Sequence, residues 1–173
     1  TKMDKVITNL ITVLISILLT TTGFSQSYKT AIGLKGGSIG GLAFGGGGVN
    51  LKHFIGGKNA LEFTVGGGIN HIRGQALYEW QNNINAVEGL SWYIGAGGTV
   101  GAWGSNHYHP VRDVYYDRGF YLGANAVGGV DWSIEPLTSV PLDFAVDMGP
   151  YIGLINSNKF GWGGAFAVRY ILK

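Results

Sequence analysis

From residue 28 onward, apolar side chains recur at every second position, and glycine interrupts the sequence every few residues. The last segment shows the pattern clearly, because Phe166, Val168 and Tyr170 alternate with two alanines and Arg169. Successive side chains of a β-strand point to opposite faces of a sheet, so a period of two predicts strands rather than helices. The sequence therefore predicts an all-β domain.

We predict eight strands, each bounded by glycine-rich or polar turns. They cover residues 28–38, 46–54, 60–67, 69–80, 90–103, 120–135, 142–155 and 161–172. An even number of antiparallel strands returns both chain ends to one side of a membrane-spanning barrel. The interior of an eight-stranded barrel is just wide enough to be filled by side chains. The predicted architecture is an eight-stranded antiparallel up-and-down β-barrel with a polar lumen that side chains fill.

Nearly all the charged residues of the predicted strands fall on one of the two strand faces. This set consists of Lys35, Lys52, Glu62, Glu79, Asp131, Asp143, Asp147 and Arg169. Charges in a narrow, poorly hydrated lumen must pair, because a desolvated charge without a partner is strongly destabilising. We predict that these residues form an ion-pair network that plugs the barrel. The alternative is a polar gate whose pairs exchange partners to admit ions.

The apolar face carries tryptophan and tyrosine near the strand ends, which predicts that it meets lipid. Rings with an apolar body and a polar tip suit the two membrane–water interfaces. The predicted girdle has Tyr78, Trp80, Trp92, Trp132 and Tyr170 at one rim, with Trp103 and Trp162 at the other. Only 13% of residues are charged, against roughly 25% in soluble domains. We therefore predict a transmembrane barrel, the alternative being a soluble barrel with the apolar face inside.

The start of the chain reads as a separate segment. An apolar run at 6–19 follows Lys2 and Lys5 and precedes small residues at Gly23 and Ser25, which is typical of a secretory signal peptide. We predict that residues 1–25 are cleaved and that residues 26–173 form the barrel. The alternative is a retained anchor, for which the run is short, since a spanning helix needs about 20 apolar residues.

Several segments resemble the small porin-like outer-membrane barrels of Gram-negative bacteria. They are "ALEFTVGG", "ALYEW", "LSWYIGAGGTVGAW", "YLGANAVGGVDWSIEPLTSVPLDFAVDMGPYIGL" and "GGAFAVRYILK". The resemblance implies an integral outer-membrane barrel of eight strands with both chain ends in the periplasm. It also implies contact with outer-membrane lipid, and with the barrel-assembly machinery during biogenesis. The turns at 55–58, 81–89 and 136–141 would then be periplasmic, and the long loop at 104–119 would face outside.

That long loop contains the other candidate functional residues. His107 and His109, with Asp113 and Asp117 nearby, are spaced to suggest a metal site or a catalytic dyad, but nothing in the sequence marks a positioned nucleophile. We predict no catalytic residue, no metal and no cofactor. The loop is also a candidate partner contact through His107, Tyr108, His109, Arg112, Tyr115 and Tyr116. The equal alternative is that its tyrosines extend the aromatic girdle.

The sequence thus predicts a structural or interaction protein of the cell envelope. It would stabilise the outer membrane or act as an accessory subunit of a larger membrane complex. The alternatives are a small ion-conducting pore and a surface hydrolase that uses the loop histidines. A net charge of +2 argues against nucleic acid as a partner, and the absence of cysteine excludes thiolate chemistry.

Overall fold

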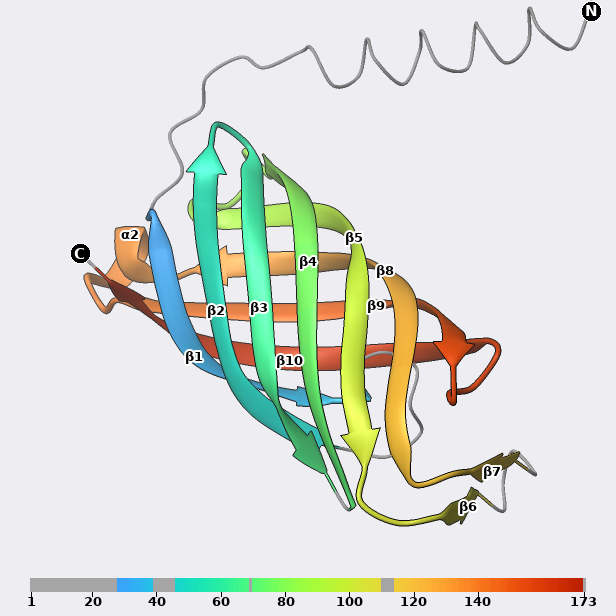
Figure 1. Cartoon of the computed structure of the whole chain (residues 1–173). Coiled ribbons are helices and arrows are strands. Elements are labelled where there is room, and N and C mark those ends of the chain that lie inside the picture. Colours follow the sequence, from blue (N-terminus) through green and yellow to red (C-terminus); the bar gives the residue numbers. More distant parts are fainter. Residues whose placement is uncertain (1–27, 39–45, 69, 110–113, 173) are drawn as a thin grey trace, which may run out of the picture.

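The computed structural model describes residues 28–38, 46–68, 70–109 and 114–172. The predicted signal peptide at 1–25, the loop 39–45 and Arg112 lie outside these residues. Eight long strands form a closed barrel in the order β1-β10-β9-β8-β5-β4-β3-β2 (Figure 1). Each strand pairs antiparallel with its neighbour, and β1 closes the barrel against β10. The predicted up-and-down barrel of eight strands is confirmed.

The barrel strands differ from their predicted ranges by only a few residues at the ends. Their bounds are β1 Thr30–Gly37, β2 Gly46–Gly56, β3 Asn59–Gly68, β4 His71–Asn83, β5 Leu90–Trp103, β8 Gly119–Ser133, β9 Leu142–Ile155 and β10 Gly161–Leu172. A two-stranded hairpin, β6 His107–His109 and β7 Val114–Tyr116, rises from the connection between β5 and β8. Residues 104–119, predicted as a loop, therefore contain strand pairing of their own.

A short helix, α2 (Glu135–Thr138), connects β8 to β9 where the sequence predicted strand up to Glu135. Pro136 stops the strand, because proline has no N–H to donate to a ladder and its fixed φ favours the first turn of a helix. The helix ends at Ser139, whose left-handed φ of 61° lets its N–H donate to the carbonyl of Glu135 at 2.8 Å. Within the described residues, no helix has the length and hydrophobicity needed to cross a membrane.

The two ends of the barrel differ. The terminal end carries the start of β1, the end of β10 and α2, and Thr30 pairs with Leu172 there (Figure 1). The loop end carries the β6–β7 hairpin and the turn after β9. At the loop end the side chain of Asn156 donates to the carbonyl of Asp117 at 2.7 Å and accepts from its N–H at 3.2 Å. These bonds attach the β9–β10 turn to the base of the hairpin.

The side chains are distributed inside out relative to a soluble protein. Leu34, Val65 and Met148, on three different strands, are 62 to 68% exposed on the outer face. The eight charged residues of the predicted network are at most 6% exposed, because they point into the lumen. An apolar exterior around a polar interior is the arrangement of a barrel that spans a membrane.

This arrangement predicts a depth-dependent response to charge on the outer face. We expect Val146→Arg, in the middle of β9 and 59% exposed, to destabilise the barrel in lipid vesicles by about 2–4 kcal/mol. Val87→Arg is the control, because Val87 is exposed in the turn before β5, outside the strands. Urea unfolding of both variants in vesicles measures the difference. Equal stabilities would contradict a lipid-facing position for Val146.

Candidate functional site: the ion-pair network of the lumen

The lumen holds a charged network to which seven of the eight barrel strands contribute an ionisable acid or base. Its members are Lys35 of β1, Lys52 of β2, Glu62 of β3, Glu79 of β4, Asp131 of β8, Asp143 and Asp147 of β9, and Arg169 of β10. The eighth strand, β5, contributes Tyr93, whose hydroxyl donates to Asp147 Oδ2 at 2.8 Å. Each of these residues occupies an inward position of its alternating strand.

Arg169 lies at the centre of the network. Its guanidinium contacts Glu62 through Nη2, and its Nη1 donates to Asp143 Oδ2 at 2.7 Å and to Asp131 Oδ2 at 3.3 Å. Its Nε donates to Asn50 Oδ1 at 2.5 Å. A planar guanidinium has five donors in a fixed fork, so one side chain can join carboxylates from three strands.

The two lysines extend the network on either side of Arg169. Lys35 Nζ lies 2.6 Å from both Glu62 Oε1 and Asp147 Oδ2. Lys52 Nζ lies 2.6 Å from Asp131 Oδ2 and 2.9 Å from Glu79 Oε2, and it also faces the ring of Tyr93 at 4.5 Å. The structure therefore brings together all eight residues that the sequence placed in the lumen.

An apolar layer covers the network at the terminal end. It consists of Tyr28, Ala31, Phe54, Ala60 and Ile171, all buried. Tyr28 and Phe54 meet edge to face, with ring centroids 5.2 Å apart. This layer separates the ionic groups from the terminal end, where β1 begins and β10 ends.

An aromatic layer covers the lumen at the loop end. The Trp103 ring lies 5.1 Å from that of Tyr121 and 5.3 Å from that of His71. Trp103 Nε1 donates to the carbonyl of Asn156 at 3.2 Å, which joins this layer to the β9–β10 turn. The prediction that Trp103 belongs to the outer girdle is wrong: it is 2% exposed. Trp103 lies four residues after the buried Thr99 on the same strand, and residues an even number apart share a face, so its side chain points inward.

The other six predicted girdle residues lie on the outer face. Tyr78 and Trp80 are half-buried against each other, with centroids 4.8 Å apart, and the other four, Trp92, Trp132, Trp162 and Tyr170, are exposed. Trp162, near the start of β10, lies towards the loop end, and the other five lie towards the terminal end.

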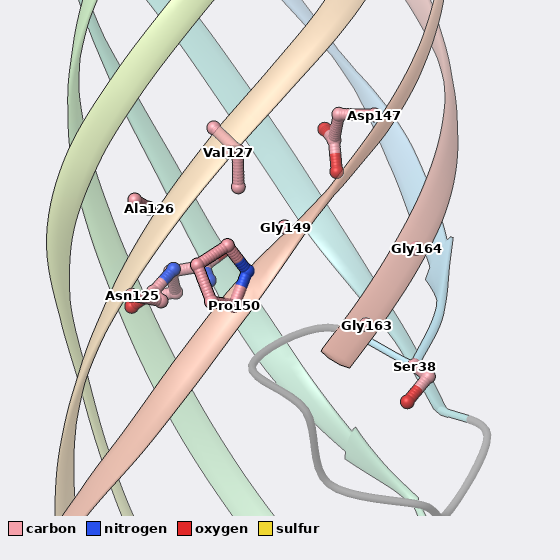
Figure 2. Close-up of a pocket in the computed structure, with 10 residues that line it drawn as sticks. Ser38, Asn125, Ala126, Val127, Asp147, Gly149, Pro150, Gly163 and Gly164 are labelled. Carbon is pink, nitrogen blue, oxygen red and sulfur yellow. The ribbon is translucent and has the colours of Figure 1, made fainter. Parts of the chain in front are cut away.

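A small cavity adjoins the charged network on the loop side of Asp147. Figure 2 shows it beside Asn125, Val127, Asp147 and Pro150, and its volume is about 10 Å³. A water molecule needs about 10–15 Å³ of such volume, so this space is too small for a hydrated ion. The neutral side chains here form a chain of weak contacts, because Thr99 Oγ1 lies 3.5 Å from Gln75 Nε2 and 3.2 Å from Asn125 Oδ1.

The structure places the candidate contact residues of the long loop only in part. Tyr108 and Tyr115 pair across the β6–β7 hairpin and are 49% and 62% exposed. His107 pairs with Tyr116, and His109 with Val114, along the backbone. Arg112 and Asp113 lie outside the described residues. Within the part of the chain that the structure describes, no group of three or more His, Cys, Asp or Glu side chains is arranged to hold a metal ion.

The network predicted from the sequence did not include Asn50 and Tyr93. Both are uncharged, and only their contacts with Arg169 and Asp147 reveal their role. The inward tyrosines of the loop end, Tyr121 and Tyr151, also went unrecognised. Their odd-numbered positions, which they share with Asp131 and Asp147 on the same strands, are the signal that identifies them.

Comparisons with known proteins support the fold. No family model matches the chain, and a search of curated proteins finds no match. Solved structures do match, and among them are Neisserial surface protein A, at 12% identity with a TM-score of 0.52, and the N-terminal β-barrel domain of Pseudomonas aeruginosa OprF, at 15% identity with a TM-score of 0.53. Both alignments cover 83% of this chain, and they cover 95% and 97% of those chains, respectively. The chain thus has the fold of these small eight-stranded outer-membrane barrels.

The network predicts a large effect of removing its central cation. We expect Arg169→Ala to destabilise the barrel by about 3–5 kcal/mol, because it leaves buried carboxylates without their partner. Arg169→Lys should lose less stability, since lysine keeps the positive charge but lacks the planar set of guanidinium donors. Lys159→Ala, in the exposed β9–β10 turn, should change stability by less than about 0.5 kcal/mol. The unfolding midpoint in urea measures all three, and an unchanged midpoint in Arg169→Ala would contradict a stabilising role.

Proposed function

We propose that the protein is an integral barrel of the bacterial outer membrane, with both chain ends in the periplasm, and that its lumen is closed. Its role is then structural or that of an interaction partner: it stabilises the membrane or acts as an accessory subunit of a larger membrane complex. The observation that carries this proposal is the filled lumen. A buried ionic network lies between an apolar layer at one end and an aromatic layer at the other.

The outer face supports the membrane location. It is apolar along the strands and carries exposed rings towards both ends, such as Trp162 at one and Tyr170 at the other. Such belts position a barrel at the two lipid–water interfaces. The likeness to solved outer-membrane barrels agrees with this location, and the predicted signal peptide would deliver the chain to it.

The burial of the network supports a role without catalysis. Its carboxylates and cations are at most 6% exposed, so a substrate in solution does not reach them. Pairing of opposite charges also argues against conduction, because a conducting pore presents a water-filled path lined by groups that bind ions weakly. The surface left for function is the loop end, where the β6–β7 hairpin extends beyond the barrel wall (Figure 1).

Conductance in planar bilayers tests whether the lumen is closed. We expect the refolded barrel, residues 26–173, to insert without producing steady openings. Heat-dependent migration on a gel and a β-type circular dichroism spectrum confirm that a sample without channel openings is folded. Steady, ion-selective openings would contradict the closed lumen and favour the pore.

The hairpin tyrosines test the interaction role. We expect the double variant Tyr108→Ser, Tyr115→Ser to fold normally but to lose proteins that cross-link to the barrel in native outer membranes. Phe160→Ser is the matched control, because Phe160 is also an exposed aromatic residue at the loop end, 57% exposed on the neighbouring turn. Quantitative mass spectrometry of the cross-linked proteins measures the difference. The same set of cross-linked proteins in the double variant and the wild type would contradict a contact through these tyrosines.

A further inference from the structure

The charges of the lumen network do not balance if every group is ionised. The network contains five carboxyl groups, Glu62, Glu79, Asp131, Asp143 and Asp147, and three cations, Lys35, Lys52 and Arg169. Fully ionised, it would carry two negative charges in excess. Buried carboxylates without a compensating cation are strongly destabilising, and such groups take up protons instead.

The other titratable groups near the lumen do not supply the missing charge. Tyr28 and Tyr93 border the network, and a tyrosine hydroxyl, whose ordinary pKa is about 10, carries no charge at pH 7. Arg73 lies on the same strand as Glu79 but six residues away, a separation of about 20 Å along an antiparallel strand. His71 lies further still, against Trp103 in the aromatic layer. Inorganic cations are not favoured either, since the described residues hold no group of acidic or histidine side chains arranged for a metal.

The contacts distinguish the carboxyl groups from one another. Glu62 contacts Lys35 and Arg169, and Asp131 contacts Lys52 and Arg169. Asp147 has Lys35 and the hydroxyl of Tyr93. Each of these three carboxylates therefore has two charged or strongly polar donors, as an ionised group in a dry site requires.

The remaining two carboxyl groups have a single donor each. Among the described residues, Lys52 is the one cation that Glu79 contacts, at 2.9 Å and without the geometry of a hydrogen bond. Within the same described part of the chain, Arg169 is the one cation that Asp143 contacts, and Asp143 Oδ1 accepts no hydrogen bond. Asp143 and Asp131 also share the same Arg169 nitrogen, and two carboxyl groups at one donor favour a state in which only one is ionised.

We propose that the lumen network is a two-proton site: Glu79 and Asp143 carry protons at neutral pH, which leaves three carboxylates against three cations. Unfolding exposes both groups to water, where a carboxyl group ionises well below pH 7, so it releases two protons. The folded barrel binds more protons than the unfolded chain, and its stability therefore falls as the pH rises through neutrality. The inference is independent of whether the barrel conducts ions.

Infrared spectroscopy of the folded barrel in detergent tests the two protons directly. A protonated carboxyl group has a C=O stretch that is resolved from the carboxylate and amide bands. We expect this band at pH 7 in the wild type, a weaker band in Glu79→Gln and in Asp143→Asn, and no band in the double variant. Glu88→Gln, in an exposed turn, should leave it unchanged. Absence of the band in the folded wild type, or its persistence in the double variant, would overturn the proposal.

Stability measurements provide a second readout. Glutamine and asparagine mimic neutral carboxyl groups, so Glu79→Gln and Asp143→Asn should keep the wild-type urea midpoint at pH 7, whereas Glu62→Gln should lower it. The unfolding equilibrium constant of the wild type should rise by up to about a hundredfold per pH unit near neutrality, the limit for two released protons. The double variant should lose this dependence. Equal pH slopes in the wild type and the double variant would contradict the two-proton site.

Discussion

The rest of this structure depends on one constraint: no strand edge can be left unpaired in lipid. Backbone groups that face hydrocarbon have no water to bond with, so the sheet must close on itself. Here closure depends on the pairing of β1 with β10, and the two strands approach closely at Gly33 and Arg169. A Cβ on Gly33 would lie 1.9 Å from the carbonyl oxygen of Val168, so only glycine fits this position. Arg169, which pairs with Gly33, points into the lumen and is fully buried.

Closure with eight strands then determines what the lumen can contain. The interior is narrow enough for side chains from opposite walls to meet, so polar groups inside it contact one another rather than bulk water. Lys35 and Asp147, 112 residues apart in the chain, form an ion pair for this reason. Buried charges and their partners thus follow from the barrel geometry, and the apolar and aromatic layers at its two ends keep water from them.

The sequence predicts the alternation of faces more reliably than it predicts depth along the barrel. The alternation of strand residues between two faces is enough to predict that Lys52, Glu62 and Arg169 lie in the lumen, and they are buried there. Alternation also identifies Trp103 as an inward residue, since it lies four residues from the buried Thr99 on β5, so its place near a strand end does not make it face lipid. The alternation does not reveal which charges pair, because pairing depends on the stagger between strands that are distant in the sequence. The contacts that leave Glu79 and Asp143 with one donor each depend on that stagger.

An ion-pair network is not the only way to fill such a lumen, and this bears on why it is present. Replacing buried ion pairs by apolar side chains of similar volume is often neutral or stabilising, so the network is weak evidence of selection for stability. Its members come from seven strands, and a slip of one residue in any of them would turn a charge towards lipid. Strands such as β1, in which glycine and alanine occupy four of the eight positions, have few large side chains to fix their register. The network supplies this information, because a slip of one residue in β3, β8, β9 or β10 would break a contact between Arg169 and a carboxyl partner.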